Sequence, residues 1–218
     1  MRIATLTLCA LVAASHSLAT PVFKITEVYT GLSGPDGTPD WIEVTNFGDM
    51  DGDTSVLWYD DESEDVASGA QLTSFMLSPG ESAVFLVTGD VTATSVDEFR
   101  DIWGPVAKVG TGPGGGGLSQ NGDQATILLG DGTVVDRFAF GGGAGAATFE
   151  DPTGTDSIVV STLGLNGAYE SAPFFNDNII PVDPFLVTLV GSPGAIPEPG
   201  ALALLVAGFA TAGIRRRG

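Results

Sequence analysis

The chain has 218 residues, which is enough for one domain with a hydrophobic core and sorting signals at its ends. Its 31 glycines and 13 prolines are too many for a helical bundle and are usual for short strands joined by turns. Lysine and arginine total 8 against 27 acidic residues, a formal net charge of −19. The sequence therefore argues against a nucleic-acid partner, which requires clustered positive charge.

Residues 1–19 predict a secretory signal peptide. Arg2 supplies the positive charge at the start, and the apolar stretch that follows is too short to span a membrane comfortably. The small residues Ser17 and Ala19 occupy the third and first positions before a cleavage site. We therefore predict that signal peptidase cleaves between Ala19 and Thr20.

The single histidine, His16, and the single cysteine, Cys9, both lie in this segment. The mature chain would then have neither imidazole nor thiol. That excludes disulfides, nucleophile pairs that use histidine, and metal sites built on these ligands. We expect no enzymatic activity. Glycoside hydrolysis needs only two carboxylates, so a carboxylate-dependent glycoside hydrolase stays as a distant alternative.

Short strands are predicted along the body of the chain, because apolar and β-branched residues recur between turn-rich stretches. The run at 83–87 is continuously apolar and suits a strand buried on both faces. The strands are expected at residues 22–29, 41–45, 56–59, 72–77, 83–87, 124–129 and 133–140.

The strongest hairpin signal is Gly-Asp-Gly at 130–132. In the strand that follows it, Val134, Phe138 and Phe140 are expected to face the core, and Arg137 is expected to face solvent.

Three aspartates at alternate positions, Asp49, Asp51 and Asp53, match the spacing of the first ligands of an EF-hand. The position that requires glycine in that loop is Thr54, and the last ligand would be Asp60 rather than glutamate, so an EF-hand is disfavoured. Two interpretations stay open: a weak calcium site made of these carboxylate oxygens or of the acidic run at 60–65, and an acidic loop that is simply solvated.

One short helix is predicted over one end of the strands. Ser95 and Glu98 form a capping-box pattern, and Gly104 followed by proline ends the helix. Its apolar face is made of Val96, Phe99, Ile102 and Trp103. The tryptophans 41, 58 and 103 are expected in the core rather than as sugar-binding platforms, and the Trp58–Tyr59 pair is the candidate for an exposed aromatic surface.

The C-terminal residues 196–218 have three parts in a fixed order. Pro197, Glu198 and Pro199 come first, an apolar run at 201–214 follows, and the arginines at 215, 216 and 217 precede the last residue. As a helix the apolar part would be about 22 Å long, short of the roughly 30 Å hydrocarbon core unless flanking residues or local thinning make up the difference. Basic residues stay on the cytoplasmic side, so the body would lie outside.

This tail resembles the PEP-CTERM sorting signal of Gram-negative bacteria. The resemblance implies recognition of Pro197, Glu198 and Pro199 by an exosortase, membrane retention by a C-terminal helix, and orientation by Arg215, Arg216 and Arg217. It also implies delivery to the cell surface or the extracellular matrix. A plain C-terminal membrane anchor is the alternative.

The body, residues 20–195, resembles the lamin-tail domain. The similarity rests on short motifs in order: Ile-Thr-Glu-Val at 25–28, Asp-Trp-Ile-Glu-Val-Thr-Asn at 40–46, Leu-Ser-Pro-Gly-Glu at 77–81, Leu-Ser-Gln-Asn-Gly-Asp at 118–123, Asp-Gly-Thr-Val-Val-Asp at 131–136 and Ser-Pro-Gly at 192–194. The family's Ser-Gly-Trp turn is absent, and residues 55–59 stand in its place, which leaves the register of that strand open. The resemblance implies an immunoglobulin-like β-sandwich and no catalytic residues.

Together these observations predict a mainly β fold with one short helix, flanked by an N-terminal signal helix and a C-terminal membrane helix. We expect an exported, acidic, non-enzymatic structural or adhesion protein that meets signal peptidase and exosortase during export. The competing interpretation is a module that binds calcium or extracellular polysaccharide.

Overall fold

A computed structural model of the chain describes residues 19–31, 40–87, 93–112, 114, 116–175 and 186–195. The predicted signal helix and the predicted sorting tail from residue 196 onward lie outside these residues. Within the described ranges, no helix is both long enough and apolar enough to cross a membrane.

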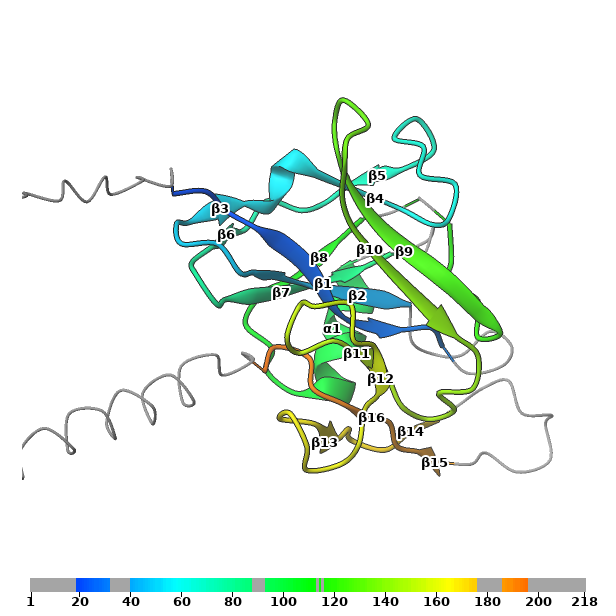
Figure 1. The fold of residues 1–218 in the computed structure, drawn as a ribbon. Helices are drawn as coiled ribbons and strands as arrows, with labels where there is room; N and C mark the ends of the chain where they lie inside the picture. The colour runs from blue at the N-terminus through cyan, green and yellow to red at the C-terminus, as the bar shows by residue number, and fades with distance from the viewer. Residues whose placement is uncertain are drawn as a thin grey trace, which may run out of the picture.

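The structure is mainly β, as the turn-rich composition predicts (Figure 1). Its described elements are β1 (Phe23–Tyr29), β2 (Trp41–Asn46), β3 (Gly52–Asp53), η1 (a 3₁₀ turn, Thr54–Val56), β4 (Leu57–Asp60), β5 (Ala70–Gln71), β6 (Met76–Leu77), β7 (Ser82–Leu86), α1 (Ala93–Trp103), β8 (Val109–Thr111), β9 (Gly122–Leu129), β10 (Val134–Gly141), β11 (Phe149–Glu150), β12 (Val159–Val160), β13 (Tyr169–Glu170), β14 (Phe174–Phe175), β15 (Leu186–Val187) and β16 (Val190–Gly191).

Two sheets form the body of the domain. One has six strands in the order β12-β11-β1-β2-β7-β8, and the other has four in the order β10-β9-β4-β5. All the pairings in both sheets are antiparallel except that of β7 with β8. Short two-stranded ladders β3–β6, β13–β16 and β14–β15 complete the described fold.

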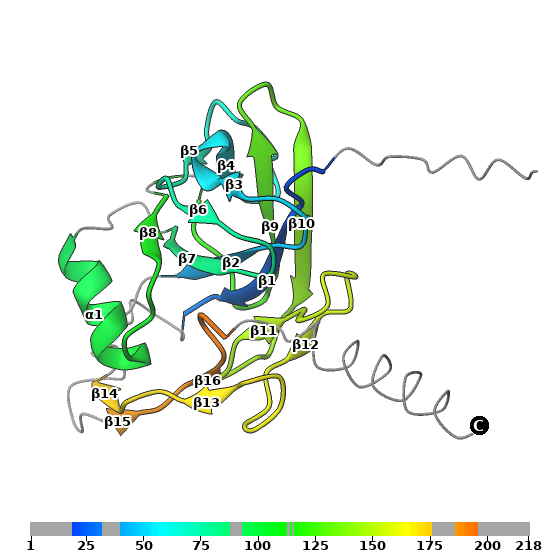
Figure 2. The ribbon, with the colours of Figure 1, turned by 90° about the vertical axis from the view of Figure 1, so that its left-hand side faces the viewer.

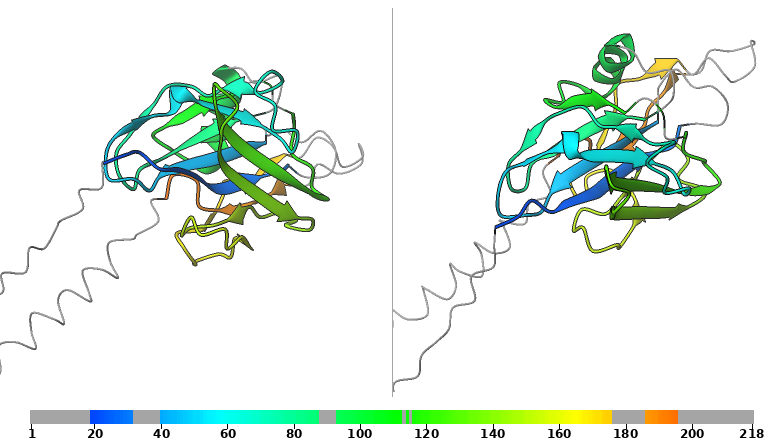
Figure 3. Two further views of the ribbon diagram at one scale, coloured as in Figure 1. Left: turned by 45° about the horizontal axis from the view of Figure 1, so that its top comes forward. Right: turned by 90° about the horizontal axis from the view of Figure 1, so that it is seen from above.

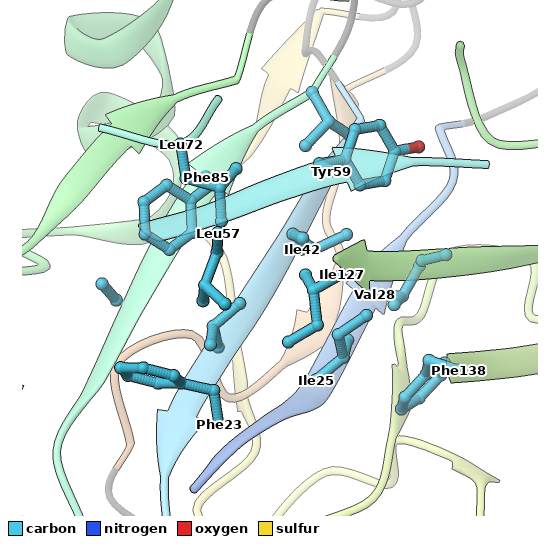
Figure 4. Packing of buried hydrophobic residues seen from close by; sticks show 14 of the residues in the cluster. Phe23, Ile25, Val28, Ile42, Leu57, Tyr59, Leu72, Phe85, Ile127 and Phe138 are labelled. Carbon is cyan, nitrogen blue, oxygen red and sulfur yellow. The ribbon is translucent and has the colours of Figure 1, made fainter. Parts of the chain in front are cut away.

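The main core lies between the two sheets, and Figure 4 shows its packing. Alternate residues of β1, β2 and β7 point from the six-stranded sheet toward those of β4, β9 and β10. This inner core contains the buried side chains of Phe23, Ile25, Val28, Ile42, Val44, Leu57, Tyr59, Leu72, Leu77, Ala83, Phe85, Val87, Leu118, Ala125, Ile127, Phe138, Phe140 and Phe149.

A second cluster lies on the opposite, outer face of the six-stranded sheet. Helix α1 covers part of this face beside β8 (Figure 2), where it packs against Tyr29, Trp41 and Leu86 at one end of the strands. Its predicted apolar face is confirmed, because Phe99, Ile102 and Trp103 are buried there. The ring of Trp41 meets those of Phe99 and Trp103 edge-on at 5.7 Å.

The ends of α1 agree with its sequence signals to within a turn. The helix begins at Ala93, two residues before the predicted cap. It ends at Trp103, and Gly104 follows with a φ of +84°, the left-handed conformation that glycine accommodates at helix ends.

Several strand predictions are confirmed and others need correction. The five residues of β7 are all buried, and Leu129 N–H donates to Thr133 O at 2.8 Å across the predicted hairpin. Of the strand expected at 72–77, only Met76–Leu77 forms β6. Strand β4, whose register was open, places Tyr59 opposite Ile127.

In β10 the structure corrects the expected position of Val134. Phe138 and Phe140 are buried and Arg137 is exposed, as expected. However, the register with β9 shifts between Val134 and Asp136, which inserts one extra residue. Val135 therefore packs against the inner core in place of Val134.

Candidate functional site

A row of three glutamates crosses the outer face of the six-stranded sheet. Glu27 of β1 pairs with Glu43 of β2 and with Glu150 of β11, so the three residues are neighbours on adjacent strands. Their exposed fractions are 1%, 2% and 2%, respectively. Because buried acidic side chains are rare, this glutamate row is the most unusual chemical feature among the described residues.

A β-bulge in β1 gives the row its position. Ile25 pairs with Val44 and faces the inner core, but the register shifts before Glu27, which lies opposite Glu43. The shift leaves Thr26 and Glu27 on the same face, because a bulge sets two residues against one. The hydroxyl of Thr26 donates to Glu43 Oε1 at 2.9 Å, which shows that both reach the outer face.

The C-terminal segment, residues 186–195, supplies hydrogen-bond donors to Glu27. The backbone N–H of Ser192 donates to Glu27 Oε1 at 2.7 Å, and its hydroxyl donates to Oε2 at 3.0 Å. The hydroxyl of Thr148 donates to Oε1 at 2.5 Å. Both oxygens of this carboxyl group therefore have partners.

Glu43 and Glu150 also accept hydrogen bonds from neutral donors. Gly194 N–H donates to Glu43 Oε2 at 2.5 Å. Asn166 Nδ2 donates to Glu150 Oε1 at 2.9 Å, and the hydroxyl of Ser192 lies 3.5 Å from Glu150 Oε2. These donors are all neutral, and within the described ranges no lysine or arginine forms an ion pair with the row.

Glycine at position 191 lets the C-terminal segment come close enough to make these bonds. A Cβ built there would lie 2.8 Å from Glu27 Oε1, 2.9 Å from Thr148 Cγ2 and 2.9 Å from Trp103 Cη2. Ordinary Cβ contacts are longer, so any other residue would force either β16 or these side chains to shift.

Burial changes the proton affinity of the row. Loss of water raises the pKa of Glu27 to about 7, against the opposing effect of its hydrogen bonds to Thr148 and Ser192. Burial also raises the pKa of Glu43, to about 8, and the negative charge of Glu27 adds to that effect. Near neutral pH Glu43 therefore favours the protonated form, and Glu27 is close to half-protonated.

A nearby tyrosine responds to the same charges. Burial, followed by the charges of Glu27 and Glu43, raises the pKa of Tyr169 to about 12. Its hydroxyl donates to Trp103 O at 2.6 Å, which links β13 to the end of α1.

Chemically, this arrangement can hold protons and anchor a backbone segment. Raised carboxyl pKa values are typical of general acids in active sites, and the pKa values of Glu27 and Glu43 are raised in this way. Here, however, the side chains are almost completely buried, and their oxygens are bonded to donors of the protein itself. The row gives no support to the glycoside hydrolase alternative, because a substrate would have to displace those donors.

The sequence-predicted site residues are separated from this row. Pro197, Glu198, Pro199 and the three terminal arginines lie outside the described residues. Ala19 and Thr20, which flank the predicted cleavage site, are both exposed.

The three aspartates of the candidate calcium loop do not converge on one point. Asp49 Oδ1 accepts from the N–H of Thr20 at 2.9 Å. Asp53 Oδ1 accepts from the N–H of Ser55 and the hydroxyl of Ser74, each at 2.9 Å, and so caps the 3₁₀ turn. Across the described parts of the chain, no group of three or more acidic, histidine or cysteine side chains is placed to hold a metal ion. Weak calcium binding stays an untested prediction.

The aromatic predictions divide in two. Trp41 and Trp103 are buried in the outer cluster, as expected. Trp58 is half-buried. Its neighbour Tyr59 is fully buried, and the Tyr59 hydroxyl donates to Gly116 O at 3.3 Å, so any accessible aromatic surface of the pair belongs to Trp58 alone.

Sequence reasoning missed the glutamate row. One signal was present: strict alternation in β2 places Glu43 on the same face as Trp41, a residue expected to be buried. The contribution of Glu27 was hidden by the bulge, and the donors from residues 192 and 194 come from far along the chain.

No known protein family matches this chain, and no curated protein is significantly similar to it.

Proposed function

We propose that this chain is an exported, non-enzymatic protein of the cell surface or extracellular matrix of a Gram-negative bacterium, with a structural or adhesion role. The observation that carries the proposal is the three-part sequence at 196–218, which resembles an exosortase sorting signal and follows a predicted signal peptide. In this scheme Pro197, Glu198 and Pro199 are recognised, and the three arginines hold the tail on the cytoplasmic side.

The fold supports this assignment at the level of class. Two packed sheets with short strands and one helix fit the immunoglobulin-like β-sandwich that the lamin-tail resemblance implies. Such sandwiches commonly serve as surface and adhesion modules, and fold class alone does not identify a ligand.

The hydrogen bonds of the glutamate row support a further part of the proposal, in which the junction between domain and tail withstands mechanical tension. Ser192 and Gly194 are bonded to Glu27 and Glu43 of the central strands, only a few residues before the sorting motif. The described chain also begins (blue) and ends (orange) on the same side of the domain in both views of Figure 3. A domain tethered through its last residues would therefore transmit tension directly into its largest sheet.

Cell fractionation with variants of the tail tests the proposal. Glu198→Gln, and separately deletion of the three arginines, should leave export and signal-peptide removal intact and prevent delivery to the surface or matrix fraction. Glu98→Gln on α1 is the matched control, since that glutamate is exposed and belongs to the folded domain. Wild-type distribution of both tail variants would contradict the proposed sorting.

A further inference from the structure

The first described residues lie along the last residue of β2, Asn46, and the loop that follows it, residues 47–51. Phe47 N–H donates to Val22 O at 2.7 Å, and Asp49 N–H donates to Thr20 O at 3.4 Å. These bonds continue the antiparallel pairing of β1 with β2 beyond its end at Phe23 and Asn46. The chain is thus held in register back to Thr20.

The side chain of Asn46 organises this loop. It is completely buried, and its Oδ1 accepts from Val22 N–H at 3.1 Å and from Gly48 N–H at 2.9 Å. Its Nδ2 donates to Met50 O at 2.8 Å and to Leu77 O at 2.9 Å. All four hydrogen-bonding positions of the amide are used, which fixes the loop against the domain.

Gly48 lets the two segments come together. A Cβ at this position would overlap the carbonyl oxygen of Thr20 and the backbone of Pro21. The close approach brings the carboxylate of Asp49 to the nitrogen of Thr20, 2.9 Å from Oδ1. The loop is therefore shaped around the segment that begins at Thr20.

The chemical identity of that nitrogen depends on processing. In the precursor it is a peptide N–H, and the adjoining peptide bond to Ala19 lies at exposed residues. Hydrolysis of this bond adds one water, releases the Ala19 carboxylate and leaves Thr20 with an α-ammonium group. The neutral hydrogen bond to Asp49 then becomes a charge-assisted ion pair.

We propose that Asp49 is the counter-ion of the amino terminus that signal-peptide removal creates, and that residues 46–50 form the receptor for the mature N-terminus. This inference rests on the export proposed above and adds to it the site that receives the processed end. Among the described residues, Asp49 supplies the charged side chain that is hydrogen-bonded to the Thr20 nitrogen. Asp51 belongs to the same loop, and Asp53 is engaged with Ser55 and Ser74.

The test uses the protein purified after export and processing, with no engineered truncation at its C-terminal end. N-terminal sequencing first establishes where the chain begins. The pKa of the α-amino group is then measured from the pH dependence of its reductive methylation. We expect Thr20 at the terminus and an α-amino pKa about half a unit above the usual range of roughly 7.7–8.0, which slows methylation near pH 7 about threefold.

Three variants decide the outcome. Asp49→Asn should return the pKa to the usual range, whereas Asp51→Asn, an equal charge change in the same loop, should leave most of the shift. A chain that retains Ala19 at its terminus should also lose the shift with Asp49 intact, which guards against a folding defect in the Asp49 variant. Equal pKa values in wild type and Asp49→Asn, with Thr20 first, would overturn this inference alone. A different first residue would overturn it together with the predicted cleavage site.

Discussion

The two faces of the six-stranded sheet are both buried, but by different means. The inner face meets the four-stranded sheet through side chains that are almost entirely apolar. The outer face meets α1 through aromatic rings at one end, and at the other it meets the C-terminal segment through the glutamate row. The same strands supply both faces, because successive residues of a strand point in opposite directions.

The difference shows how far each face depends on its partners. Apolar burial is non-directional and grows with the area removed from water, so the inner face needs only complementary shape. A buried carboxyl group needs specific donors and a suitable protonation state, since an unsatisfied one carries the full desolvation penalty. The outer face should therefore be sensitive to pH and to small displacements of residues 189–194, and the inner face should not.

Removal of inner-face volume should have the largest effect. Phe85 is fully buried, with its ring centre 5.9 Å from that of Phe75. Phe85→Ala should lower the free energy of unfolding by about 3–5 kcal/mol, because the lost apolar contacts leave a cavity. Urea denaturation measures the change. Val56→Ala, at an exposed site, should change it by less than about 0.5 kcal/mol, and similar losses in the two variants would contradict the assigned core.

Displacing the C-terminal segment should have an intermediate effect. Gly191→Ala places a Cβ against Glu27 Oε1, Thr148 and Trp103, and should cost about 1–3 kcal/mol. Hydrogen exchange should accelerate in β13 and β16 more than in β7 or β9. Gly141→Ala is the matched control, because a Cβ there meets nothing within 4 Å. Equal exchange patterns in the two variants would argue against a tight outer-face contact.

The pH dependence of stability isolates the glutamate row. Native pKa values of about 7 for Glu27 and about 8 for Glu43 exceed the ordinary value of 4.5, so the folded state binds more protons than the unfolded state between these limits. The stability that the protonated Glu27 and Glu43 contribute is fully present below about pH 4.5. It is lost as pH rises through their native pKa values of about 7 and about 8. We expect the free energy of unfolding to fall steadily from pH 5 to pH 8.

Glu43→Gln should flatten that decline, because the amide stays neutral. Its oxygen can accept from Gly194 N–H, and Thr26 can turn its hydroxyl toward Thr45, whose Oγ1 lies 2.8 Å away. Glu64 and Glu81 have lowered pKa values through their bonds to Arg137 and Lys108, so their contribution is lost only on acidification below this window. An unchanged pH profile in Glu43→Gln would show that the row does not control stability.

Local patterns predicted much of the inner face and little of the outer one. The continuous apolar run of β7, the glycine hairpin before β10 and the apolar face of α1 each signal their structure within a few residues. The bulge at Glu27 and the extra residue at Val135 break the period-two pattern, so alternation placed those side chains wrongly or not at all.

The sequence by itself determined the β-rich composition, the positions of the longer strands and of the helix, and the export signals that we propose for the two ends. Only the tertiary structure decided that three glutamates would share one buried row, and that Thr20 would meet Asp49. The physical reason is the separation of the interacting residues along the chain. Turn and strand preferences act between residues close in the chain, whereas Ser192 reaches Glu27 across 165 positions. Such contacts form only when the whole sheet brings their strands together.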